Sequence, residues 1–62
     1  MDISNFIGKK EEEVTKELKN DGKMVYHIAR RDDESFARTM DYRQDRVNLE
    51  IQAGMVVSAI IG

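Results

Sequence analysis

The sequence contains neither cysteine nor proline nor tryptophan in its 62 residues. Without cysteine, the chain has no disulfide and no thiolate metal site to supplement a hydrophobic core, and its redox compartment is not revealed. A chain of this length buries only about 60% of the surface that it exposes when unfolded, which supports one core and not two. We therefore expect a single domain, residues 1–62, that packing alone holds together.

An excess of charge of one sign is also lacking, because ten basic residues stand against twelve acidic residues. With no basic block to neutralise phosphates, we expect no nucleic-acid partner. The longest apolar run, near residues 54–62, is far shorter than the roughly 20 residues that span a bilayer, so we expect no membrane partner. The sequence leaves the localisation unknown: cytoplasmic, or secreted if a signal was removed.

In the absence of proline, three glycines divide the chain: Gly8, Gly22 and Gly54. Between the first two, KKEEEVTKELKND has good helix formers, with acidic residues first and lysines towards the end, which complements the helix dipole. This pattern predicts an amphipathic helix that stops at Gly22 in a left-handed conformation. The apolar positions that we expect on its buried side are Val14 and Leu18, extended by Phe6 and Ile7.

Three segments have the composition of β-strands. MVYHIAR (24–30) is rich in β-branched and aromatic residues, and RVNLEIQ (46–52) alternates between apolar and polar residues, which predicts one dry and one wet face. QAGM then predicts a tight hairpin into VVSAII, a strand apolar enough to be buried on much of both faces. The prediction is an α+β fold, with one α-helix packed on a small mixed parallel/antiparallel β-sheet and a long exposed loop.

The connection from residue 31 to residue 45 has neither helical nor strand periodicity over most of its length. Loops longer than roughly 12 to 15 residues are uncommon in small domains and are usually functional or disordered. A parallel strand pair needs a crossover of this length, so we expect strands 24–30 and 46–52 to run parallel. The connection is therefore the first candidate for function.

The end of this loop and the strand after it read TMDYRQDRVNLEI. The residues that follow a known pattern are Thr39, Met40, Asp41, Tyr42, Arg43, Asp45, Arg46, Val47 and Leu49. In this register the stretch resembles the reactive-site loop of the potato type I (barley chymotrypsin inhibitor-like) family of serine protease inhibitors, which has bacterial and fungal relatives. NFIGKKEEEV is similar to the segment that leads into the single helix of that family.

The resemblance implies that loop 31–45 binds a protease active site like a substrate. Met40 would fill the primary specificity pocket, and Met40–Asp41 would be the scissile bond. An unbranched thioether suits a deep apolar pocket, so subtilisin-like or chymotrypsin-like enzymes are the expected partners. The residues expected to contact the protease are Arg38, Thr39, Met40, Asp41, Tyr42 and Arg43.

The resemblance also implies a support beneath the loop. Arg46 would hold the side chains of Thr39 and Asp41, in a charge-assisted and directional contact. Asn48 stands where the family usually has a second supporting arginine, and Arg43 would add a further contact.

We expect no enzymatic activity and no cofactor. His27 is the sole histidine, so no common metal-ligand set and no Cys–His dyad can form. A serine nucleophile would need His27 beside it, and the spacing of Ser4, Ser35 and Ser58 does not suggest this. The acidic runs at 11–13 and 32–34 lack the alternating ligands and the turn glycine of a calcium loop.

Two alternatives stay open at the level of sequence. Phe36 could be an exposed contact or an anchor that folds the loop onto the core. The whole domain could also be a non-inhibitory protein-interaction module on the same scaffold, which would hold another protein through the loop or through a sheet edge. We expect a monomer, and a dimer is not excluded.

Overall fold

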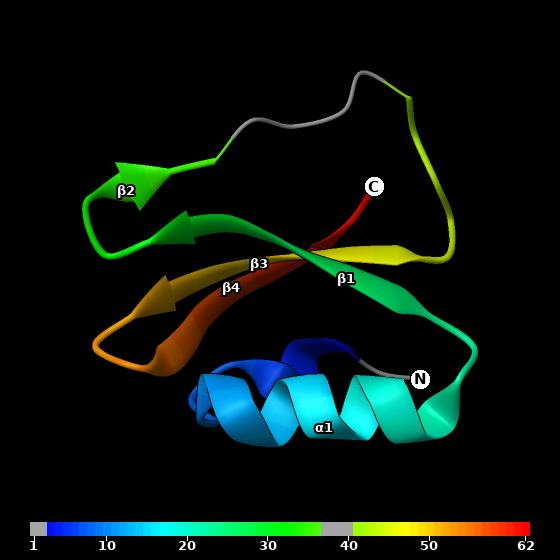
Figure 1. The fold of residues 1–62 in the computed structure, drawn as a ribbon, viewed down its shortest axis with the longest axis horizontal. Coiled ribbons are helices and arrows are strands. Elements are labelled where there is room, and N and C mark those ends of the chain that lie inside the picture. Colours follow the sequence, from blue (N-terminus) through cyan, green and yellow to red (C-terminus); the bar gives the residue numbers. More distant parts are fainter. Residues whose placement is uncertain (1–2, 37–40) are drawn as a thin grey trace.

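One mixed β-sheet forms the middle of the molecule, and an α-helix packs against one of its faces (Figure 1). The structure is a computed structural model and describes residues 3–36 and 41–62. In these residues the elements are a short 3₁₀ helix η1 (Ile3–Phe6), α1 (Glu11–Asp21), β1 (Val25–Arg31), β2 (Glu34–Ser35), β3 (Arg46–Gln52) and β4 (Met55–Ile61). The strand order is β2-β1-β3-β4, so the α+β prediction is confirmed.

Helix α1 ends where the sequence predicts. Gly22 has a left-handed conformation, with φ of 69°, and its N–H donates to the carbonyl of Leu18 at 3.3 Å. Three glutamates occupy the first turn of the helix, and Lys19 lies in the last turn. Acidic residues at the N-terminus and a basic residue at the C-terminus interact favourably with the helix dipole, and this favours the observed helix boundaries.

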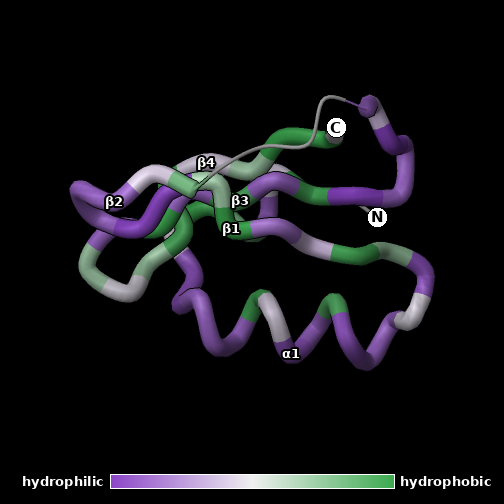
Figure 2. The backbone as a smooth tube through the Cα atoms, turned by 45° about the horizontal axis from the view of Figure 1, so that its top comes forward, coloured by the Kyte–Doolittle hydropathy of each residue, from purple (hydrophilic) through white to green (hydrophobic). Residues whose placement is uncertain are grey.

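The core lies between α1 and the sheet. Val14 and Leu18 of α1 are fully buried, and most of the rest of α1 is hydrophilic (Figure 2). The other members of the buried apolar cluster are Phe6, Val47, Leu49, Ile51 and Val56. Ile7, which we expected to extend the apolar side of the helix, is instead 53% exposed, because the chain turns away at Gly8.

Strand β3 is the centre of the sheet. It pairs parallel with β1 and antiparallel with β4, as the sequence predicts. Its dry face is confirmed, but the prediction of a wet opposite face is wrong at Asn48, which is only 9% exposed. Asn48 lies between His27 of β1 and Ile60 of β4, and these neighbours shield it from solvent.

Strand β4 is less buried than its apolar sequence predicts. Of its seven residues only Val56 is fully buried, whereas Val57 is 47% exposed and Ile60 is 53% exposed. The prediction of burial on much of both faces is wrong because β4 lies at the edge of the sheet. Helix α1 covers one face of that sheet and leaves the other face of β4 open (Figure 1).

The first part of the expected loop 31–45 is not a loop. Arg31 belongs to β1, a tight turn follows in which Asp32 has φ of 55°, and Glu34 pairs with Arg31. Phe36 continues this pairing, because its N–H donates to the carbonyl of Ala29 at 3.0 Å. A two-residue strand has no periodicity, so the sequence pattern could not reveal it.

The two turns at one end of the sheet are joined. The carboxylate of Asp32 accepts a hydrogen bond from the N–H of Ala53 at 2.8 Å, and the N–H of Asp32 donates to the carbonyl of Ile51 at 2.8 Å. Ala53 and Gly54 form the β3–β4 turn with φ of 51° and 78°. Two consecutive positive φ angles are typical of a type I′ hairpin, in which alanine is strained and asparagine is favoured.

We predict that Ala53→Asn raises the free energy of unfolding by about 0.5–1 kcal/mol, because asparagine tolerates the left-handed conformation. Ala53→Val should lower it by about 1 kcal/mol or more, because a β-branched residue adopts this conformation poorly. Urea titrations of the three proteins measure both changes. Equal stabilities for the two variants would contradict the assignment of strain to this turn.

Candidate functional site

The candidate site lies on the side of the sheet opposite α1, where the chain returns from β2 to β3 (Figure 1). Of the predicted protease-contacting residues, Arg38, Thr39 and Met40 lie outside the described residues, as does the Met40 side of the expected scissile bond. Asp41, Tyr42 and Arg43 are described and all three are exposed, with Tyr42 at 69%. The described part of the candidate site is therefore segment 41–45 together with the residues that support it.

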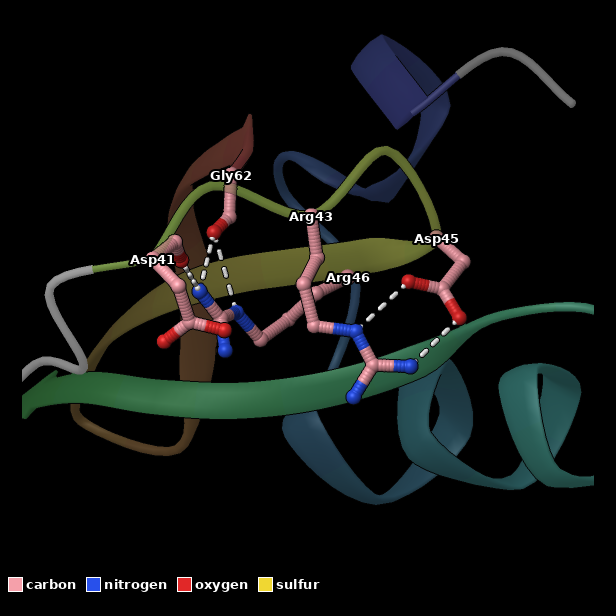
Figure 3. Close-up of polar contacts among 5 residues, drawn as sticks. All are labelled: Asp41, Arg43, Asp45, Arg46 and Gly62. Carbon is pink, nitrogen blue, oxygen red and sulfur yellow. Dashed lines mark hydrogen bonds and ion pairs between the residues drawn. The ribbon is translucent and has the colours of Figure 1, made fainter.

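Arg46, the first residue of β3, holds two separate parts of the main chain (Figure 3). Its Nη2 donates to the carbonyl of Asp41 at 2.6 Å. The same Nη2 and the Nε donate to the carbonyl of Gly62, at 2.5 and 2.9 Å. The guanidinium thus joins segment 41–45 to the residue that follows β4.

This contact differs in one respect from the expected one. Arg46 reaches Asp41 as predicted, but it binds the backbone carbonyl rather than the side-chain carboxylate. A planar guanidinium has five N–H donors in a fixed fork, so it can serve two carbonyls at once, which a lysine cannot do with the same geometry. The Arg46 contact therefore fixes the backbone whatever side chain stands at position 41.

Arg43 pairs within the segment. Its Nε and Nη2 donate to the two carboxylate oxygens of Asp45 at 2.9 and 2.7 Å. This hydrogen-bonded pair lowers the pKa of the Asp45 carboxyl below its ordinary value and raises the pKa of the Arg43 guanidinium. The further contact expected from Arg43 is thus made with Asp45, two residues along the chain.

The backbone of Asp45 provides another anchor. Its carbonyl accepts a hydrogen bond from the N–H of Val25 at 2.8 Å, at the start of β1. Segment 41–45 is therefore attached at its first residue through Arg46 and at its last residue through β1. An exposed chain segment fixed at both ends loses less conformational entropy when it binds a partner.

Gly62 has a role that the sequence reasoning missed. A Cβ atom placed on it would lie 3.3 Å from Nδ2 of Asn48 and 3.8 Å from Cδ2 of Tyr42. A side chain at this position would thus crowd the asparagine amide, and it would be in ordinary van der Waals contact with the tyrosine ring. The sequence pattern could not reveal this role, because a glycine after a strand does not distinguish a close approach of side chains from a simple turn.

Asn48 supports β4 in the described part of the chain. Its Nδ2 lies 3.5 Å from the carbonyl of Ile60, which is a long hydrogen bond. It stands two residues beyond Arg46 on the same strand and the same face of the sheet. Asn48 thus contacts the end of β4, close to the glycine against which the ring of Tyr42 lies.

His27 lies in β1, as predicted, and its Nε2 is buried without a hydrogen-bond partner. Within residues 3–36 and 41–62, no cluster of three or more histidine, aspartate or glutamate side chains is placed to hold a metal ion. In the same ranges, no helix is both long enough and apolar enough to cross a membrane.

A pocket of about 310 Å³ lies at the opposite end of the sheet, beside the two turns. Its charged lining residues are Arg30, Asp32, Asp33 and Glu50. Arg30 already donates to the carbonyl of Asp32 at 3.1 Å, and Asp32 is bonded to Ala53. These contacts stabilise the turns, so we assign the pocket no role at the candidate site.

No family model, no curated protein and no solved structure matches this chain. The family resemblance of residues 39–51 therefore depends on the matching residues of this chain alone.

We predict that Arg46→Lys lowers the free energy of unfolding by about 1–2 kcal/mol, because an ammonium lacks the fixed fork of donors with which the guanidinium reaches both carbonyls. Arg43→Lys is the matched control: it makes the same substitution within segment 41–45, but in an exposed ion pair whose contribution is small. Chemical denaturation gives the stabilities, and NMR hydrogen exchange of the amides of segment 41–45 reports on its local opening. An equal loss in both variants would show that Arg46 has no special supporting role.

Proposed function

We propose that this domain is a reversible, substrate-like inhibitor of serine proteases of the subtilisin or chymotrypsin type. The observation that carries the proposal is the attachment of the backbone of Asp41 to Arg46, and through Arg46 to Gly62. Asp41 is the residue that would follow the scissile bond. The resemblance of residues 39–51 to an inhibitory loop supplies the class of partner.

The chemistry of serine proteases explains why this attachment favours inhibition over digestion. The catalytic serine attacks the carbonyl of Met40, the Met40–Asp41 bond breaks, and the Asp41 amine leaves with a proton. In an ordinary substrate this amine diffuses away and water hydrolyses the acyl-enzyme. Here the Asp41 carbonyl, in the same residue as the new amine, is held by Arg46 at 2.6 Å. The amine stays close to the ester and can attack it again, so the peptide bond re-forms.

The side of the loop after the scissile bond offers a second contact with a protease. Tyr42 is 69% exposed while its ring lies close to Gly62 at one edge. Exposed aromatic side chains contribute large contact areas when a partner buries them. Tyr42 would thus add affinity next to the specificity contact that we assign to Met40.

The test is a titration of the purified domain against subtilisin and chymotrypsin, with residual activity and mass spectrometry as readouts. We predict stoichiometric inhibition and slow cleavage confined to the Met40–Asp41 bond. Rapid cleavage at several bonds, or no effect on either enzyme, would contradict the proposal. The non-inhibitory interaction module would then be the better hypothesis.

Met40→Arg tests the assignment of the specificity residue. We predict that inhibition moves from chymotrypsin towards trypsin, because a cationic side chain fits the acidic pocket of trypsin-like enzymes. Gln44→Arg is the control, since it adds the same charge at an exposed position of the segment before β3. An unchanged profile for Met40→Arg would show that another residue enters the pocket.

A further inference from the structure

The chain that leads towards the expected scissile bond starts at the short strand β2. This strand pairs antiparallel with the end of β1, and the N–H of Phe36 then donates to the carbonyl of Ala29 at 3.0 Å. Phe36 stands four residues before Met40 in the sequence. Residues 34–36, which we call the first arm of the loop, are thus attached to β1 by backbone hydrogen bonds.

The first arm has little else to hold it. An isolated β-hairpin is marginally stable in water, and a strand of two residues adds few hydrogen bonds to one. The arm lies at the edge of the sheet, and its three residues, Glu34, Ser35 and Phe36, are all exposed. Burial in the core therefore contributes little to its position, which depends on hydrogen bonds instead.

Three hydrogen bonds meet at Asp32, in the turn between β1 and the first arm. Its N–H donates to the carbonyl of Ile51 at 2.8 Å, and its carboxylate accepts from the N–H of Ala53 at 2.8 Å. Its carbonyl accepts from Nε of Arg30 at 3.1 Å. The turn that carries the first arm is thereby fixed to the end of β3 and to the turn that follows β3.

Strand β3 thus supports both sides of the expected scissile bond. Arg46 at its beginning holds the carbonyl of Asp41, whereas Ile51 near its end accepts the hydrogen bond from Asp32. In religation, the Asp41 amine attacks the ester carbonyl of Met40, and the serine oxygen leaves with a proton. The amine and the ester belong to opposite sides of the bond, so re-formation is fast only if both sides keep their positions.

We infer that Asp32 is a positioning residue for inhibition, which acts on the side of the loop before the scissile bond as Arg46 acts on the side after it. This inference rests on the proposed inhibition of serine proteases. When the carboxylate bond to Ala53 is lost, the first arm should leave the edge of the sheet more often. The acyl-enzyme should then be hydrolysed more often before the Asp41 amine returns, and net cleavage should become faster.

Three variants of the full chain separate this bond from other properties of the turn. Asp32→Gly removes the carboxylate and keeps a residue that adopts the positive φ of 55° without strain. Asp32→Asn is the conservative variant, because its side-chain oxygen can accept from Ala53 and asparagine tolerates the same φ. Asp33→Gly is the matched control: it removes a carboxylate and adds a glycine in the same turn, but leaves Asp32 in place. Circular dichroism checks that all three fold.

The first readout needs no protease. Hydrogen exchange of the Phe36 amide, followed by NMR, should be about threefold to tenfold faster in Asp32→Gly, as expected for the loss of one hydrogen bond. Asp32→Asn and Asp33→Gly should exchange at nearly the rate of the unmodified chain. Equal rates in Asp32→Gly and Asp33→Gly would overturn the assignment of Asp32 as the support of the first arm.

The second readout is the reaction with subtilisin. Asp32→Gly should be cleaved at Met40–Asp41 about threefold to tenfold faster than the unmodified chain, and Asp32→Asn should restore slow cleavage. Faster exchange of Phe36 without faster cleavage would overturn the positioning role and leave the proposed function intact. Absence of inhibition by the unmodified chain would contradict the proposed function itself, and the role of Asp32 with it.

Discussion

The parallel pairing of β1 with β3 is the constraint on which the rest of the structure depends. Two parallel neighbours cannot be joined by a tight turn, so the chain must return along the length of the sheet between them. Helix α1 occupies one face, and segment 41–45 of the return lies on the other side (Figure 1). The fold thus requires a long connection between β1 and β3, and the β1–β2 hairpin shortens its free part.

Such a connection can act as an inhibitory loop only if something rigid holds it. Strand β3 meets this requirement, because Val47, Leu49 and Ile51 are almost completely buried against α1 and fix its position. Arg46 is the first residue of that strand, so the strand fixes its position. Its guanidinium in turn holds the carbonyls of Asp41 and Gly62 by hydrogen bonds. Core packing and loop support are therefore coupled through adjacent residues of one strand. A change that shifts β3 should weaken the loop even when it lies far from it.

Much of the fold could be predicted from the sequence, because the spacing of apolar residues and the positions of glycines reflect the local geometry of helices, strands and turns. The helix stop at Gly22, the dry face of β3 and its parallel pairing with β1 are examples. Burial of Asn48 and exposure of β4 could not be predicted in the same way, since both depend on which strand is central and which lies at the edge. At the site, the family resemblance implied that Arg46 holds the side chain of Asp41, whereas Arg46 binds the carbonyl of that residue. The sequence could not reveal this difference, because the choice between carboxylate and carbonyl depends on backbone direction.

The most direct test of the central claim, that Arg46 keeps the Asp41 side of the cleaved bond in place, is religation. The domain cleaved at Met40–Asp41 is purified and incubated with a trace of subtilisin, and mass spectrometry follows the return of the intact chain. We predict that a substantial fraction of intact protein re-forms, and that Arg46→Ala abolishes this return, because the amine of Asp41 is then free to move away from the acyl-enzyme. If the cleaved protein stays cleaved, or if Arg46→Ala religates as well as the unmodified chain, the account is wrong.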